Sequence, residues 1–207
     1  MNKERLTLNY RDNKEVMNIK ILVEDSVIIK PYGYVYDTIY YEDGSKKIIH
    51  NGEMNMIVDT FKKVVTSLLS NHIGYHGILY MALGQGEHDE GDGSSSSWDS
   101  LDAAQRALKS ATNLIVLYDE IARITITTQY LDGADNVTEE ITNKLKISAS
   151  IPSTIQGYLR EFALFGGNAT DLLDSGLMLN HKAHEVIPFN TGDSVMTIER
   201  ALHLVLL

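Results

Sequence analysis

The sequence predicts an α+β fold that is mainly β, an antiparallel β-sandwich or barrel-like sheet with one principal amphipathic helix packed on it. β-branched and aromatic residues alternate with polar residues in several short runs, and Gly, Asn and Asp separate these runs. A sustained helical period occurs over residues 53–72. We divide the chain into an N-terminal arm (1–15), a β-hairpin region (16–50) and a main β-rich domain (51–207).

The composition argues against several classes of protein. The chain has 207 residues, of which 43% are hydrophobic, which is enough to build the core of one domain. It contains no cysteine, so disulfides and thiolate metal sites are excluded. No apolar run approaches the roughly 20 residues of a membrane span, and we expect no membrane association. The net charge of -10 and the scattered basic residues argue against direct nucleic-acid binding, so protein partners are expected.

The first 50 residues predict an arm followed by short strands. Residues 1–15 are polar and charged without a period, which is typical of an arm that orders on a neighbouring subunit. Alternating apolar residues then predict two short strands at 17–23 and 27–29. Residues 42–45 (Glu-Asp-Gly-Ser) predict a hairpin turn after a tyrosine-rich strand.

That tyrosine-rich strand places several aromatic residues on one face. Tyr34, Tyr36 and Tyr40 occupy even positions, which lie on the same side of a strand. They form either a candidate contact face or a partly buried strand face with hydroxyl groups toward water.

Residues 53–72 predict the principal helix. Asn51 is the expected N-cap, and Gly74 comes where a C-terminal glycine is expected. The apolar stripe that would pack on the sheet consists of Ile57, Phe61, Val64, Val65, Leu68 and Leu69.

A buried strand at 75–83 leads into a flexible acidic and serine-rich loop, 87–97. The intervening Gly84-Gln85-Gly86 lacks the third glycine and the helix of a phosphate-binding loop. The loop either is a solvated surface loop or binds Ca²⁺ or Mg²⁺, since carboxylates are the oxygen ligands these ions prefer. Trp98 ends the loop and is expected to anchor it. No other cofactor is expected. The candidate metal ligands are Glu87, Asp89, Glu90 and Asp92.

The second half of the chain predicts one short helix and several strands. Residues 99–110 form a helix with Leu108 among its inward residues, and 124–130 and 144–150 form strands. Three runs separated by turn residues predict an antiparallel meander at the end of the chain. These runs are 157–167, 175–184 and 194–206.

Four charged residues lie inside otherwise apolar strand ends. They are Glu120 with Arg123, and Arg160 with Glu161. Either an arginine meets a glutamate across the sheet as a buried pair that fixes register, or each is a solvated charge at a strand edge.

No recognised catalytic framework is present in the sequence. His181 and His184 are three residues apart, and on a strand they point to opposite faces, while His72 and His76 straddle Gly74. The chain lacks a nucleophile-elbow motif and paired carboxylates in a known arrangement. We therefore expect no enzyme and no small-molecule substrate, and we place the histidines at the surface or at an interface.

The order of the motifs resembles the small structural proteins of tailed bacteriophages that occupy the tail, baseplate or neck, and the proximal domains of tail-fibre proteins. The resemblance covers about residues 50–207. The motifs are Asn51-Gly52, Ala82–Gly86, Leu117 with Glu120 and Arg123, Leu159–Gly167, and Ser175–His184.

The resemblance implies a virion protein made in the host cytoplasm, a homo-oligomer whose other partners are virion proteins. One alternative is a receptor- or carbohydrate-binding fibre adaptor, in which Tyr34, Tyr36, Tyr40 and Trp98 would stack on a sugar. A second alternative is a capsid decoration protein, which differs only in where it docks.

Overall fold

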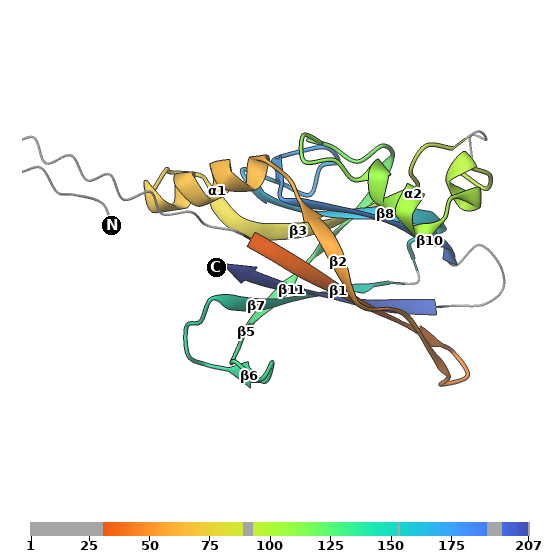
Figure 1. The fold of residues 1–207 in the computed structure, drawn as a ribbon, viewed down its shortest axis with the longest axis horizontal. Coiled ribbons are helices and arrows are strands. Elements are labelled where there is room, and N and C mark those ends of the chain that lie inside the picture. The colour runs from red at the N-terminus through yellow and green to blue at the C-terminus, as the bar shows by residue number, and fades with distance from the viewer. Residues whose placement is uncertain (1–30, 89–92, 153, 190–195, 207) are drawn as a thin grey trace, which may run out of the picture.

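The computed structural model describes residues 31–88, 93–152, 154–189 and 196–206 (Figure 1). The arm at 1–15 and the strands expected at 17–29 lie outside these ranges. Its strands are β1 (Pro31–Tyr41), β2 (Lys46–Ile57), β3 (His76–Gly84), β4 (Glu120–Thr125), β5 (Thr127–Leu131), β6 (Val137–Thr138), β7 (Lys144–Ile151), β8 (Gly157–Gly167), β9 (Leu177–Met178), β10 (Asn180–Phe189) and β11 (Met196–Leu206). Its helices are α1 (Thr60–Leu69), the 3₁₀ helix η1 (Ser97–Ser100) and α2 (Ala103–Lys109).

The strands form two antiparallel layers, which confirms the predicted mainly β, α+β fold. One layer has the order β4-β3-β8-β10, with β9 paired to β8, and we call it the covered layer. The other has the order β2-β1-β11-β7-β5-β6, and we call it the open layer. The expected hairpin of the tyrosine-rich strand is β1 paired with β2.

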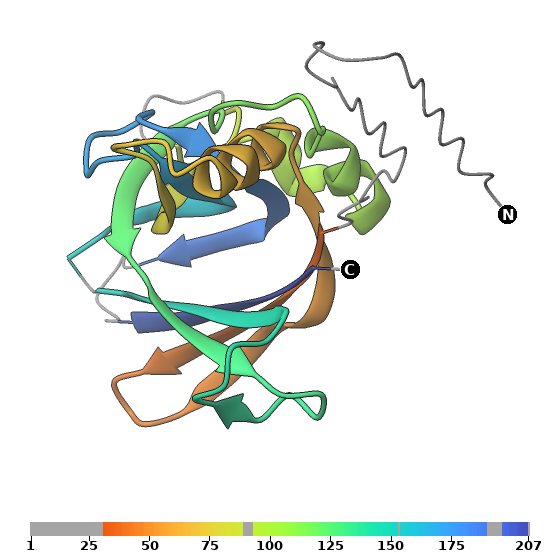
Figure 2. The same ribbon diagram turned by 90° about the vertical axis from the view of Figure 1, so that its left-hand side faces the viewer.

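The two layers are joined at both edges, so the sheet closes on itself like a barrel. At one edge β4 runs into β5 through Ile126, and the chain itself passes from the covered layer to the open layer (Figure 2). At the other edge β2 pairs with β10 through only two residue pairs, Asn180 with Ile57 and His181 with Met56. We call this short pairing the β2–β10 seam.

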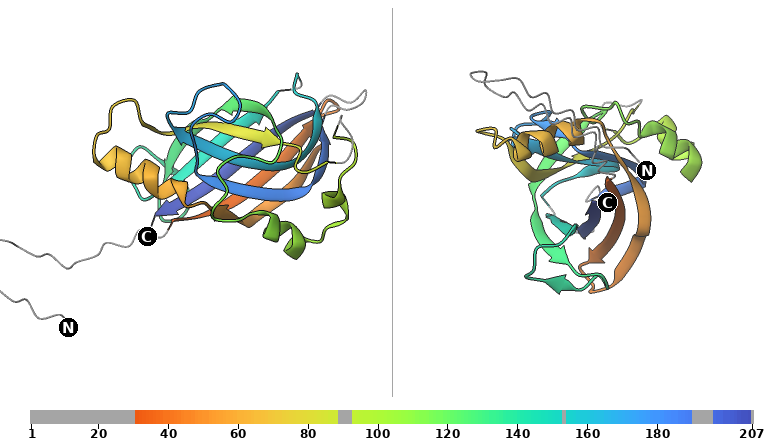
Figure 3. Two further views of the ribbon diagram at one scale, coloured as in Figure 1. Left: turned by 90° about the horizontal axis from the view of Figure 1, so that it is seen from above. Right: turned by 60° about the vertical axis from the view of Figure 1, so that its left-hand side comes forward.

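Both α-helices lie on the outer face of the covered layer (Figure 3). α1 packs on β3, β8 and β9, and α2 packs on β10. The covered layer is therefore buried on both sides. The main core includes Val35, Ile147 and Phe162, and Phe61 and Val64 of α1 belong to it. A second, smaller cluster includes Ala163 and Phe165 of β8. No helix within the described ranges is long and apolar enough to cross a membrane.

The helix predicted at 53–72 is shorter than expected. Residues 53–57 belong to β2, because Ile57 pairs with β10 at the seam. Asn51 lies in β2 and is not the N-cap; Asp59 holds that position. The helix ends at Leu69, and Gly74 lies in the turn before β3. Apolar spacing alone did not separate the end of a strand from the start of the helix that follows it.

Two further expectations are wrong in part. β8 and β10 pair as predicted, but β11 pairs with β1 and β7 in the open layer, so the last three runs do not form a meander. The helix predicted at 99–110 divides into η1 and α2, and Leu108 is 83% exposed instead of inward. Closure of the sheet explains the first difference, because the last strand completes the open layer.

Candidate functional site

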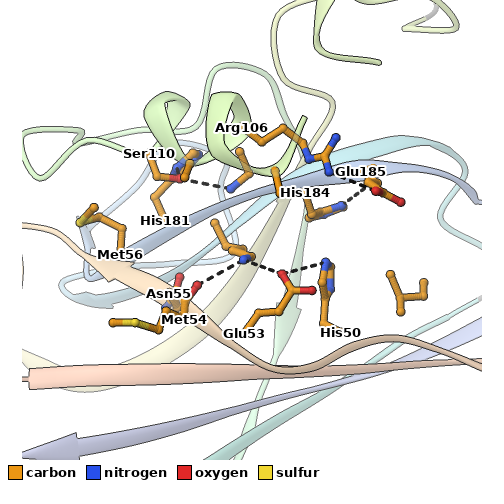
Figure 4. A pocket seen from close by; sticks show the side chains of 15 residues that line it. His50, Glu53, Met54, Asn55, Met56, Arg106, Ser110, His181, His184 and Glu185 are labelled. Carbon is orange, nitrogen blue, oxygen red and sulfur yellow. Dashed lines mark hydrogen bonds and ion pairs between the residues drawn. The ribbon is translucent and has the colours of Figure 1, made fainter. Parts of the chain in front are cut away.

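A pocket of about 390 Å³ opens where β2 and β10 diverge beyond the seam (Figure 4). After His181, β10 continues along β8 while β2 continues along β1, so the two strands separate. α2 covers the gap from outside and contributes Arg106 and Ser110 to the wall. Asp102 begins α2 with a capping box to Gln105, which fixes where this short helix starts.

Glu161 of β8 is the central acceptor beside this pocket. Its side chain is fully buried, and its Oε1 accepts backbone N–H groups from Gly86 at 3.2 Å, Tyr118 at 2.9 Å and Asp119 at 3.1 Å. A Cβ on Gly84 would lie 2.7 Å from the same oxygen, so the first glycine of the Gly84-Gln-Gly motif makes room for the carboxylate. The Gly84-Gln85-Gly86 motif therefore makes room for the Glu161 carboxylate and donates one backbone hydrogen bond to it.

The other oxygen of Glu161 leads to the pocket through His181 and Ser110. Glu161 Oε2 lies 2.8 Å from His181 Nε2, and His181 Nδ1 lies 2.8 Å from Ser110 Oγ. Register explains the first contact: Ala183 is opposite Glu161, and His181 is the diagonal neighbour on the same face. Ala183 N–H also donates to Ser110 Oγ at 3.2 Å, which fastens the end of α2 to β10.

A second acid–histidine pair lies on the hairpin side of the pocket. Asp37 and His50 are opposite each other in the β1–β2 register, and Asp37 Oδ2 lies 2.6 Å from His50 Nδ1. Asp37 is fully buried and His50 is 5% exposed. The ring of His184 packs edge-on against that of His50, with centroids 5.6 Å apart. Two histidines from different layers thus meet at the pocket.

The remaining polar wall of the pocket contains paired charges and one unpaired amide. Lys182 Nζ lies 2.9 Å from Glu53 Oε2, and Arg106 lies 3.1 Å from Glu185. Asn55 is 6% exposed, and neither its amide nitrogen nor its amide oxygen has a hydrogen-bond partner. Buried polar groups are nearly always bonded, so this amide is an unusual feature of the wall.

The four charged strand residues are buried, but only two of them pair with each other. Glu120 and Arg123 form an ion pair of 2.5 Å along β4, with side chains 0% and 1% exposed. Arg160 and Glu161 do not pair, because successive side chains of a strand point to opposite faces. Arg160 instead binds Asp99 through both carboxylate oxygens, at 2.6 and 2.8 Å.

Asp99 and Trp98 belong to η1, which follows the acidic loop. The hydrogen bonds from Arg160 hold the pKa of Asp99 below its ordinary value, against the opposing effect of burial. Trp98 is 1% exposed, and its ring lies against Gly86, whose φ of +70° suits glycine. Its Nε1 donates to Glu87 at 3.2 Å. Trp98 therefore lies at the covered layer, whereas the tyrosines of β1 belong to the open layer.

Of the four candidate metal ligands, only Glu87 lies within the described residues. Lys109 and Trp98 hydrogen-bond Glu87 and lower the pKa of its carboxyl group. Asp89, Glu90 and Asp92 lie outside the described residues. Within the described part of the chain, no group of three or more His, Asp or Glu residues is arranged to hold a metal ion.

The three tyrosines lie on the side of β1 opposite buried Val35 and Ile39. Tyr34 and Tyr36 are half-buried, and Tyr40 is 39% exposed. Tyr36 contacts the ring of His203, with centroids 4.6 Å apart.

Sequence reasoning missed the pocket itself. It placed His72, His76, His181 and His184 at a surface or interface, and the first two are indeed exposed, but His181 and His184 are at most 2% exposed. His50, which is 5% exposed, was not singled out. Ser110 and Asp37 were not singled out at all. The sequence did offer one signal for the pocket. Asp37 lies between Val35 and Ile39 at an inward position of β1, and a buried carboxylate needs a partner.

No protein-family model, no curated protein and no solved structure matches this chain.

Proposed function

We propose that the protein is an architectural subunit of a tailed-phage particle, which assembles in several copies in the tail, baseplate or neck and contacts other virion proteins there. The resemblance of the sequence motifs to small structural proteins of tailed bacteriophages supports the part of the proposal that places the protein in a phage particle. The structure supports an architectural use of those motifs: Leu159–Gly167 is the central strand of the covered layer, and Ala82–Gly86 shapes the site of Glu161. Arg160 pairs with Asp99 of η1, and Arg123 donates to the carbonyl oxygens of Thr170 and Ser175 in the segment after β8, so both arginines hold connecting segments against that layer.

The observation that carries self-assembly is a group of exposed apolar side chains at one end of the covered layer. His76 pairs with Gly167, so the turn after α1 and the loop after β8 meet at this end. Leu69 and Ile73 of the turn are 77% and 96% exposed. Leu172 and Leu173 of the loop are 69% and 49% exposed. We call these four residues the end patch, and large exposed apolar groups that gather at one place are typical of contact surfaces.

The occupant we propose for the end patch is a second copy of this chain. Light scattering over a range of concentrations should show an oligomer, and the double substitution Leu69→Ser with Ile73→Ser should lower its mass. Ile141→Ser is the matched control, because Ile141 is 85% exposed but lies between β6 and β7 in the open layer. Electron microscopy of the oligomer should show a closed ring.

A wild-type chain that stays monomeric at every concentration would contradict self-assembly. That result would mean that assembly needs a partner as template, and it would favour the two alternatives, the decoration protein and the fibre adaptor. The sugar-binding adaptor is less well supported, because a tryptophan that is 1% exposed offers no face on which a sugar could stack.

A further inference from the structure

We propose that Ser110 is a nucleophile activated by His181, and that the pocket cleaves small carboxylic esters by acyl transfer. Two hydrogen bonds carry this inference: Ser110 Oγ to His181 Nδ1 at 2.8 Å, and His181 Nε2 to Glu161 Oε2 at 2.8 Å. A serine, an imidazole and a carboxylate in one hydrogen-bonded row are the three groups that activate serine in acyl-transfer enzymes of unrelated folds. In this chain the ring nitrogens have exchanged places, with Nδ1 toward the serine and Nε2 toward the carboxylate. This activity is independent of assembly.

The carboxylate sets the direction of the proton in this row. A carboxylate only accepts hydrogen bonds, so His181 Nε2 carries the proton that points to Glu161. In the neutral ring Nδ1 then holds the lone pair, and the Ser110 hydroxyl donates to it. Glu161 is therefore a positioning residue, and three backbone N–H groups on its other oxygen hold it in place.

The row ends at an accessible place. Glu161 and His181 are fully buried, whereas Ser110 is half-buried and lines the pocket of about 390 Å³ together with Met54 and Met56 (Figure 4). The same wall holds Asn55, whose amide has no partner.

The reaction consumes one ester and one water. Ser110 Oγ forms a bond to the carbonyl carbon while its proton passes to His181 Nδ1. The bond from that carbon to the alcohol oxygen breaks, and the alcohol leaves with the proton from His181. Water then attacks the acyl-serine, His181 takes a proton from it, and the carboxylic acid leaves as Ser110 recovers its hydrogen. Neither oxidant nor metal enters this balance.

The direct test is a fluorophosphonate probe on the full chain. Ser110 Oγ would form a bond to phosphorus, fluoride would leave, and intact mass with peptide mapping would locate the adduct. We expect one adduct, on Ser110, lost in Ser110→Ala and formed about 100-fold more slowly in His181→Gln, because the base that takes the serine proton is then absent. Ser100→Ala is the control, because Ser100 also lies near the end of a short helix but bonds only to Ser97 O. An unlabelled wild type, or labelling that persists in Ser110→Ala, overturns the proposal.

A second test does not depend on the serine. The chain has no cysteine, so Ser110→Cys and Ser100→Cys each carry a single thiol. A thiol beside His181 should form a thiolate more readily, and we expect alkylation by iodoacetamide at pH 6.5 to be at least about 10-fold faster in Ser110→Cys than in Ser100→Cys. Equal rates in two variants with wild-type melting temperatures would show that Ser110 only fastens α2 to β10.

Discussion

The covered layer and the open layer are built from the same antiparallel pairing, yet they differ in what they bury. β8 of the covered layer is buried at nine consecutive positions, Leu159–Gly167, because the open layer lies beneath it and the helices lie above it. β1 of the open layer alternates, with Val35 and Ile39 buried and the tyrosines between them partly exposed. A strand covered on both sides has no solvated face on which to place a charge.

The buried charged side chains of both layers have close partners. Arg160, Glu161 and Arg123 lie in the covered layer, and each has ionic or backbone partners at 3.2 Å or less. Asp37 is the corresponding residue of the open layer, and it pairs with His50. A charge removed from water is tolerated only when it is paired, so covering a layer on both sides forces such networks to be complete.

The largest effect we expect comes from breaking the network of the covered layer. Glu161→Gln should lower the free energy of unfolding by about 3–5 kcal/mol, because the charged hydrogen bond from His181 is lost and the amide NH₂ then faces the ring N–H, which leaves two buried donors unsatisfied. Glu185→Gln is the control: its carboxylate is 74% exposed beside Arg106, and we expect a change below about 0.5 kcal/mol. Urea denaturation measures both. Equal values would show that the buried hydrogen bonds of Glu161 contribute no more to stability than an exposed ion pair of the same layer.

A smaller effect, with a pH signature, is expected at the rim of the covered layer. Asp99→Asn should cost about 1.5–3 kcal/mol at pH 7, the range for hydrogen bonds to charged groups. Because the pKa of Asp99 is lowered in the folded state by Arg160, its stabilisation is present above the unfolded pKa of about 3.9 and is lost as pH falls through the folded pKa.

The wild type and the Asp99→Asn variant should therefore converge in stability as the pH is lowered below about 3.9. Denaturation curves at pH 7, 5 and 3 give this comparison. A difference that stays constant across these pH values would show that the carboxylate charge does not contribute.

The smallest effect is expected on the outer face of the open layer. Tyr40→Thr should change the free energy of unfolding by no more than about 0.5 kcal/mol, because Tyr40 is 39% exposed and Thr suits a strand. Its neighbour Ile39 is 4% exposed, and Ile39→Ala should cost about 2–5 kcal/mol. Thermal melting of the pair measures the contrast. A large loss in Tyr40→Thr would show that the open layer is covered on both faces as well.

The same contrast explains how much of the fold could be predicted from sequence. The alternation of β1 and of β7 follows from one-sided burial, and both strands were predicted from it. The end of β2 could not be separated from α1, because Ile57 fits the period of the helix as well as the seam. Pairing of β11 with β1 depends on closure between distant segments, which no local period encodes.

The candidate site was less predictable for a related reason. The two hydrogen-bond partners of the His181 ring are distant in sequence: Glu161 is 20 residues away and Ser110 is 71 residues away. A local motif search cannot find partners that the topology of the sheet brings together. The charged strand residues were recognised, but the partner of Arg160 was Asp99 of η1, which follows a polar loop.

The two edges at which the layers join are built differently. At the β4–β5 edge the layers are held by the covalent chain through Ile126, whereas at the β2–β10 seam they are held by two residue pairs. We therefore expect local opening to begin at the β2–β10 seam, while the β4–β5 connection keeps the two layers joined. The pocket lies directly beside the seam, so opening of the seam would bring solvent to His181, which is fully buried in the closed fold.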